Sequence, residues 1–185
     1  MIYFDSAATT LQKPPQVARA VQSAIGTLAS VGRGGHRAAM RAAETVYACR
    51  ALAAELFDAA PEQVIFTMNA THGLNIAIRT LVPQGGRVVI SGFEHNAVTR
   101  PLHALDAHIT VAGRRLFSPD ETLAAFEEAL AQGQDAAVCT QMSNVFGYAL
   151  PVMPIAALCR RYGVPLILDA SQAAGTLPVS LQKTG

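Results

Sequence analysis

The sequence contains no tryptophan and little charge. Charged residues make up 15% of its 185 residues, and 14 basic against 13 acidic residues leave a formal net charge of +1. This balance gives no electrostatic reason to expect nucleic acid or an anionic membrane surface as a partner. Hydrophobic residues make up 51% of the chain, which excludes an intrinsically disordered protein.

Lysine and cysteine are also scarce. The only lysines are Lys13 and Lys183, and the three cysteines, Cys49, Cys139 and Cys159, form no CxxC pair. Sparse thiols within apolar stretches are typical of reduced, buried side chains, so we expect all three in the core of a cytoplasmic protein. No apolar run approaches the roughly 18 residues of a membrane span, and we expect neither a signal peptide nor a membrane partner.

Short β-branched runs alternate with longer alanine-rich runs along the chain. Apolar periodicity and breakers predict helices at residues 16–29, 37–57, 71–82, 120–131 and 154–162. Strands are predicted at residues 64–67, 87–91, 109–112, 136–140 and 164–168. The segment 118–121 resembles a capping box with proline at the first helical position. This alternation predicts an α/β fold, with a mostly parallel sheet covered by helices on both faces.

Polar residues follow several of these strands, where ligands of such sheets bind. They are Asn69-Ala70-Thr71, Glu94-His95-Asn96, Ser143-Asn144 and Asp169-Ala170-Ser171-Gln172. The first group lies at a helix start, where free N–H groups and the Thr71 hydroxyl suit a phosphate monoester. A plain helix N-cap, with Asn69 or Thr71 capping and nothing bound, is the commoner explanation of such a segment taken alone.

Asp169 and His95 are the strongest single candidates for chemistry. A carboxylate at the end of an apolar strand needs a positive partner or several donors, so Asp169 could bind its own loop amides or a protonated cofactor nitrogen. His95 could act as a base or stack on a ligand. The five histidines show no HxxxH or HExxH spacing, so we expect no metal site. Taken singly, Asn144 and Gln172 fit satisfied loop polarity.

Considered together, the motifs are more specific than any one of them. In order, they are residues 3–10, 34–36, 65–71, 94–97, 143–147 and 169–173. In this order they resemble the cysteine desulfurase and selenocysteine lyase group of the class V aminotransferases, from Ile2 to about Val179. The resemblance implies a pyridoxal 5′-phosphate (PLP) enzyme of fold type I. Residues 1–35 would be an N-terminal segment and helix, and 36–185 a partial PLP-binding large domain.

The resemblance also implies roles for the candidate residues. Ala70 and Thr71 match the positions that hold the cofactor phosphate. His95 matches the imidazole stacked on the pyridine ring, where it can also handle protons and act in catalysis. Asp169 matches the carboxylate that keeps the pyridine nitrogen protonated, so that the ring remains an electron sink.

Two further positions match, and two depart. Gln172 matches the donor to the cofactor's phenolate oxygen, and Asn144 matches the amide near that oxygen and the substrate carboxylate. Ser6 stands where the family usually has asparagine, and His72 stands where it usually has glutamate. The second departure changes a charge beside the phosphate site.

The family's Schiff-base lysine lies about two dozen residues after the aspartate, and Lys183 matches no such motif. The resemblance therefore implies an N-terminal fragment, inactive by itself, of an enzyme that removes sulfur or selenium from L-cysteine or L-selenocysteine to give alanine. Such enzymes are homodimers that can pass sulfur to an acceptor protein. Alternatives are another class V aminotransferase activity, or a non-catalytic truncated module acting by association.

Overall fold

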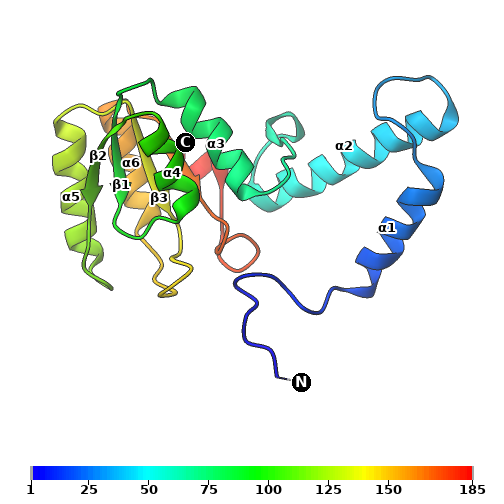
Figure 1. Ribbon diagram of the computed structural model, residues 1–185, viewed down its shortest axis with the longest axis horizontal. Helices are drawn as coiled ribbons and strands as arrows, with labels where there is room; N and C mark the ends of the chain where they lie inside the picture. Colours follow the sequence, from blue (N-terminus) through cyan, green and yellow to red (C-terminus); the bar gives the residue numbers. More distant parts are fainter. Residues whose placement is uncertain (1, 185) are drawn as a thin grey trace. The chain divides into compact units, whose positions relative to one another are not determined.

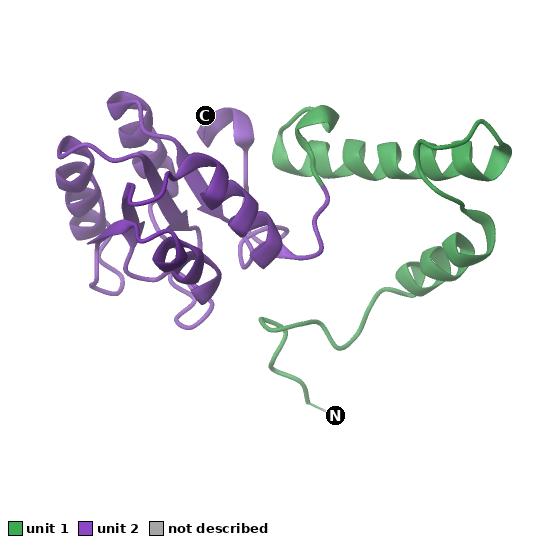
Figure 2. Ribbon diagram, turned by 45° about the horizontal axis from the view of Figure 1, so that its top comes forward, with its two compact units in different colours: residues 1–65 green, residues 66–185 purple. Residues whose placement is uncertain are grey.

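The computed structural model describes residues 2–184, which form two compact units that divide between Ile65 and Phe66 (Figure 2). The first unit is largely helical, and the second contains the only sheet among the described residues. Within residues 2–184, no helix is both long enough and apolar enough to cross a membrane.

The first unit contains the helices α1 (Pro15–Thr27) and α2 (Arg37–Phe57) and the short 3₁₀ turn η1 (Pro61–Gln63). Proline at the first turn begins α1, as the missing proline N–H has no intrahelical partner at that position. The helix α2 ends at Asp58, whose backbone adopts a left-handed conformation with φ of 51°. Both helices confirm the sequence prediction to within two residues at each end.

The second unit alternates strands and helices (Figure 1). Its elements are α3 (Ala70–Leu81), β1 (Arg87–Ser91), α4 (Asn96–Ala104), β2 (His108–Ala112), α5 (Pro119–Ala131), β3 (Ala136–Thr140), α6 (Val152–Tyr162), β4 (Leu166–Asp169) and α7 (Leu181–Thr184). The strands pair in parallel in the order β2-β1-β3-β4, with Ile90 beside Val138 and Thr140 beside Asp169. The predicted α/β fold with a parallel sheet is confirmed.

Helices cover both faces of this sheet, because its strands are apolar on both sides. On one face, side chains such as Phe126 of α5 and Ile155 of α6 pack on Val89 and Cys139. On the other face, α3 and α4 pack on residues that include Val88 and Val138.

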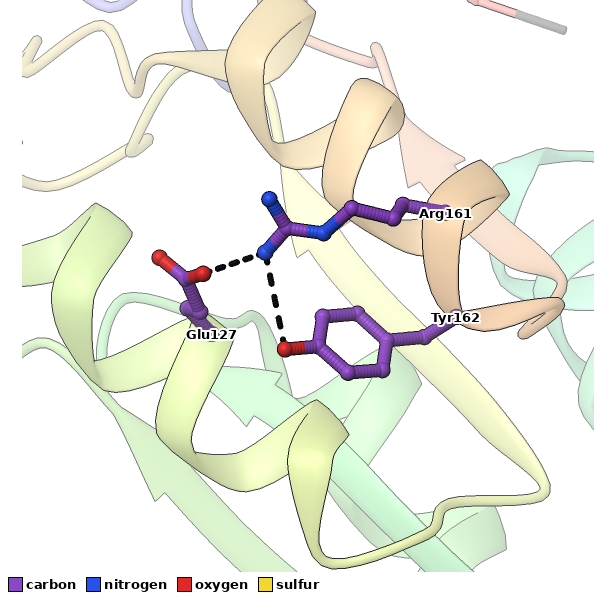
Figure 3. Close-up of polar contacts among 3 residues, drawn as sticks. All are labelled: Glu127, Arg161 and Tyr162. Atoms are coloured by element: carbon purple, nitrogen blue, oxygen red, sulfur yellow. Dashed lines mark hydrogen bonds and ion pairs between the residues drawn. The ribbon is translucent and has the colours of Figure 1, made fainter.

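The face that carries α5 and α6 also has a surface ion pair. The guanidinium of Arg161 in α6 donates to the carboxylate of Glu127 in α5 and, at 3.5 Å, to the hydroxyl of Tyr162 (Figure 3). All three side chains are solvent-exposed, so this ion pair makes a weak contribution to stability.

Two local predictions are wrong. Residues 64–67 form no strand, and Ile65 and Phe66 are 78% and 54% exposed. A strand needs hydrogen bonds to a neighbour, and none of the described strands pairs with this segment. The Ser118 side chain does not cap α5; instead, the Glu121 carboxylate accepts the backbone N–H groups of Arg114 and Arg115.

The helix α4 was not predicted, because Pro101 lies within it. The helix still forms, since Val98, Pro101, Leu102 and Leu105 make a continuous buried face against the sheet. The prediction of three core thiols is also partly wrong. Cys139 and Cys159 are buried, whereas Cys49 lies on an exposed side of α2.

Candidate functional site at the carboxyl edge of the sheet

The strand order reverses between β1 and β3, whose carboxyl ends lie at the same edge of the sheet. The chain leaves β1 toward β2 on one side and then crosses back to β3 and β4 on the other. This reversal is where ligands of open α/β sheets bind, since the loops that follow the two central strands separate there. His95 follows β1, Asn144 follows β3, and Asp169 ends β4.

The first turn of α3 has unused hydrogen-bond donors. Asn69 is the N-cap residue, and its side-chain oxygen accepts the backbone N–H of His72 at 2.9 Å. Among the described residues, the backbone N–H groups of Ala70 and Thr71 and the Thr71 hydroxyl donate no hydrogen bond. The N-cap explanation therefore holds for Asn69, but it leaves Ala70 and Thr71 available to an anion.

His95 is the N-cap of α4, and its ring is fixed by the helix that it starts. Its Nδ1 accepts the backbone N–H of Ala97 at 3.1 Å, so the neutral ring carries its proton on Nε2. The side chain is exposed, which leaves the ring face and Nε2 accessible. A side chain in this position can stack on a ligand and exchange a proton with it.

Thr71 and His95 line the same cavity of about 330 Å³ between α3 and α4. The other residues that line it are Asn75, Arg79, Asn96, Ala97, Arg100, Pro101 and Ala104. Arg79 and Arg100 make no ion pair among the described residues, so the cavity carries uncompensated positive charge. Together with the helix start, this charge favours an anionic ligand.

Asp169 is 8% exposed at the end of β4. Its Oδ1 accepts the backbone N–H of Ser171 at 3.0 Å and the Ser171 hydroxyl at 2.5 Å. Within the described part of the chain, Oδ2 accepts no hydrogen bond. The loop donors expected from the sequence therefore satisfy one oxygen, and the second can receive a proton donor from a ligand.

Glu94 lies beside the candidate residue His95, and its hydrogen bonds could not be predicted from the sequence. Its Oε1 accepts the backbone N–H of Thr140 at 2.7 Å and the hydroxyl of Ser91, whereas Oε2 is buried and has no partner among residues 2–184. The pKa of Glu94 is raised from 4.5 to about 7, chiefly by burial and in smaller part by the nearby Asp169 carboxylate. The one indication of a role for Glu94 in the sequence is that it directly precedes His95, shortly after a predicted strand.

The loop that carries Asn144 packs against the turn after β1. The rings of Phe93 and Tyr148 meet edge to face with their centroids 5.2 Å apart. The Ser143 hydroxyl accepts the backbone N–H groups of Val145 and Phe146, which closes the loop around Asn144. Asn144 itself is exposed.

Gln172 is half-buried in the turn after β4, three residues beyond Asp169. The structure brings Thr71 and His95 to one cavity and places Asp169 and Asn144 at the same sheet edge. Asn144, Asp169 and Gln172 do not line that cavity.

The two buried thiols are unsuited to chemistry. Complete burial raises the pKa of Cys139 well above its usual range, and burial raises the pKa of Cys159 to about 11. Because the thiolate is the reactive form, both side chains are inert at neutral pH.

Comparisons with known proteins identify the family of this chain. The family described as aminotransferase class V matches residues 2–185. The chain belongs to this family. An IscS-like cysteine desulfurase of Mycobacterium tuberculosis is 32% identical over 200 residues, an alignment that covers 100% of this chain and 50% of that protein. The chain thus spans about half the length of the curated relatives it matches.

Solved structures of this family share the fold. The apo cysteine desulfurase of Thermococcus onnurineus NA1 is 26% identical with a TM-score of 0.85, covering 99% of this chain and 47% of that one. A C-DES lysine-to-alanine variant with glycine covalently linked to its PLP cofactor is 23% identical with a TM-score of 0.73 and covers 92% and 47%. Because the C-DES variant is only 23% identical to this chain, its similarity shows a shared fold and no more.

The residues of this class V chain fit PLP. A phosphate monoester needs several donors, and the start of α3 has free backbone N–H groups at Ala70 and Thr71. A protonated pyridine nitrogen needs a desolvated carboxylate, and one oxygen of Asp169 accepts no hydrogen bond from the described residues. The exposed ring of His95 shares a cavity with Thr71, so it can reach a ligand held there.

Proposed function

We propose that this chain is part of a PLP-dependent cysteine desulfurase, which removes sulfur or selenium from L-cysteine or L-selenocysteine and leaves alanine. The observation that carries the proposal is one sheet edge that combines free donors at the start of α3, His95 in the same cavity, and the buried carboxylate of Asp169. The similarity to cysteine desulfurases supports the choice of reaction within the family. Residues 36–185 would belong to the PLP-binding large domain, preceded by the segment 1–35.

Each proposed binding residue contributes through its own chemistry. Ala70 and Thr71 bind the phosphate, and the positive end of α3 favours its charge. Asp169 keeps a proton on the pyridine nitrogen, so that bound PLP can act as an electron sink. His95 stacks on the ring and can move a proton at Nε2, because Nδ1 is held by the Ala97 amide.

Two polar side chains complete the proposed cradle. Gln172 would donate to the phenolate oxygen of PLP, and Asn144 would lie near that oxygen and the substrate carboxylate. Asn144 is exposed on the loop after β3, where a substrate could reach it. The positive charge of Arg79 and Arg100 would draw the anionic cofactor toward the cavity.

We further propose that the lysine that carries PLP and the cysteine that accepts sulfur come from the part of the relatives' length that this chain does not span. Lys13 and Lys183 are both exposed, and neither belongs to the proposed site. The isolated chain is then expected to be inactive. A cytoplasmic homodimer that delivers sulfur to an acceptor protein is the proposed working form.

Alanine formation from L-cysteine by the full-length protein tests this function. We expect turnover in the wild type and a fall of at least about a hundredfold in Asp169→Asn, because the amide cannot hold the ring proton. Asp120→Asn is the matched control, since Asp120 is exposed at the start of α5. A wild type that forms no alanine from L-cysteine or L-selenocysteine would contradict the proposal, and transfer of an amino group to a 2-oxo acid would assign an aminotransferase instead.

A further inference from the structure

The Glu94 side chain continues the link between β1 and β3 beyond the point where their strand pairing ends. The pairing of these strands extends to Ile90 beside Val138. Past this point, the backbone N–H of Thr140 donates to Glu94 Oε1 at 2.7 Å, and the Ser91 hydroxyl donates to the same oxygen. A carboxyl oxygen therefore takes the place that a backbone carbonyl would have in a longer strand pair.

Thr140 carries this link on to the strand that ends in Asp169. Thr140 and Asp169 are paired residues of β3 and β4, and the Thr140 hydroxyl lies 3.4 Å from the Asp169 carbonyl oxygen. On the other side, Glu94 directly precedes His95, the N-cap of α4. One side chain thus connects the turn that presents His95 to the strand end that presents Asp169.

The backbone of the loop after β2 also holds the turn between β1 and α4, at Gly92. The backbone N–H of Gly92 donates to the Gly113 carbonyl oxygen at 3.0 Å. A Cβ atom at Gly92 would lie 2.2 Å from that oxygen, so only glycine fits. The turn is therefore held at Gly92 by the loop after β2 and at Glu94 by β3.

The second oxygen of Glu94 favours a neutral carboxyl group. Oε2 is buried and accepts no hydrogen bond in the described part of the chain. The titratable groups that face Glu94 are Asp169 of β4 and the thiol of Cys139 of β3. Neither can compensate a negative charge on Glu94, whereas a neutral carboxyl keeps Oε1 as the acceptor for Ser91 and Thr140.

We propose that Glu94 is a positioning residue: in its neutral form it ties the His95 turn to Thr140 and so sets where His95 lies relative to Asp169. The connection to the cofactor rests on the function proposed above. A neutral Glu94 also leaves Asp169 as the one carboxylate charge of the pair, which is the state in which Asp169 can pair with a protonated ring nitrogen.

The test compares Glu94→Gln with Glu94→Met in the full-length protein. Glutamine keeps the Oε1 acceptor in a neutral group, whereas methionine keeps the volume and removes the acceptor. Hydrogen–deuterium exchange at the Thr140 amide is the first readout, and the affinity for PLP is the second. Glu127→Gln is the matched control, because Glu127 is exposed on α5 and pairs with Arg161 (Figure 3).

We expect exchange of the Thr140 amide to accelerate about tenfold or more in Glu94→Met, because the hydrogen bond to the neutral carboxyl group is lost. In Glu94→Gln the exchange should stay near the wild-type rate. The affinity for PLP should fall about tenfold in Glu94→Met and be rescued in Glu94→Gln. Should Glu94→Met not fold, Glu94→Ala is measured with the same expectations.

Unchanged exchange of the Thr140 amide in Glu94→Met would overturn the proposal. If Glu94→Gln and Glu94→Met accelerated this exchange and weakened PLP binding equally, the claim that Glu94 acts in its neutral form would be wrong. Unchanged PLP affinity in Glu94→Met, in a wild type that binds PLP, would remove the positioning role. A wild type that binds no PLP would refute the proposed function instead. In that case the His95 ring resonances test the positioning role without cofactor. Resonances that differ between Glu94→Gln and Glu94→Met would support the role, and identical resonances would contradict it.

Discussion

Replacing Glu94 with glutamine should change how the stability of the protein depends on pH. In the folded protein, burial first and the neighbouring Asp169 second raise the pKa of Glu94 from 4.5 to about 7. In the unfolded chain the carboxyl returns to its ordinary value. The folded state therefore holds a proton on Glu94 over a range in which the unfolded state has released it.

The sign and size of the effect follow from this difference. Below about pH 4.5 the carboxyl is neutral in both states, and the folded wild type retains its full stability. As the pH rises from about 4.5 through the folded pKa of about 7, the wild type loses the stability that the proton on Glu94 contributes. At about 1.4 kcal/mol per pH unit, the loss amounts to about 3 kcal/mol. Glutamine cannot titrate, so Glu94→Gln should not show it.

Urea unfolding of both proteins from about pH 4 to about pH 8.5 measures the difference directly. The free energy of unfolding of Glu94→Gln minus that of the wild type should rise by about 3 kcal/mol across this range, with the slope between about pH 4.5 and 7. Glu127→Gln is the control for the same substitution at an exposed position. A difference that stays constant within about 0.5 kcal/mol would refute the reasoning, since Glu94 would then titrate alike in both states.

Three further predictions concern other parts of the molecule. His95→Gln in the full-length protein should lower alanine formation from L-cysteine at least about tenfold, whereas His103→Gln, at an exposed position of the same helix, should leave it unchanged. A thiol reagent at neutral pH should label Cys49 in the folded protein and reach Cys139 and Cys159 only after unfolding; equal labelling of all three would contradict the burial. Phe126→Ala should lower the free energy of unfolding by about 3–5 kcal/mol, because Phe126 is completely buried between α5 and the sheet. A loss below about 1 kcal/mol in urea unfolding would show that this core is not packed as described.

Much of the fold could be predicted because its local patterns agree with its tertiary contacts. Strands β1 and β3 and helix α2 have the predicted bounds, since apolar runs and breakers coincide there with burial and helix ends. The segment 64–67 has the composition of a strand but no strand beside it, and composition cannot supply a partner. Helix α4 shows the opposite, because tertiary packing overrides the proline that argued against it.

The site was predicted less completely than the fold. Thr71 could be named as a candidate because it lies at the start of a predicted helix, and His95 and Asp169 because each follows a predicted strand. Parallel strands bring their carboxyl ends to one edge of the sheet. The role of Glu94 could not be predicted, since it depends on a hydrogen bond to Thr140, 46 residues away. The exposure of Cys49 could not be predicted from the sequence either. An alanine-rich helix has small apolar residues on every side, so its sequence does not show which side packs against the rest of the protein.

The affinity of the full-length protein for PLP, measured in Thr71→Val against Thr80→Val, tests the central claim most directly. Both threonines lie on α3, but Thr71 lines the cavity shared with His95, whereas the Thr80 hydroxyl donates to the Ile76 carbonyl oxygen. Loss of a hydrogen bond to a charged phosphate should weaken binding about ten- to a hundredfold in Thr71→Val. Thr80→Val should bind PLP as the wild type does. Equal affinities for PLP in all three proteins would contradict the assignment of this sheet edge as the cofactor site.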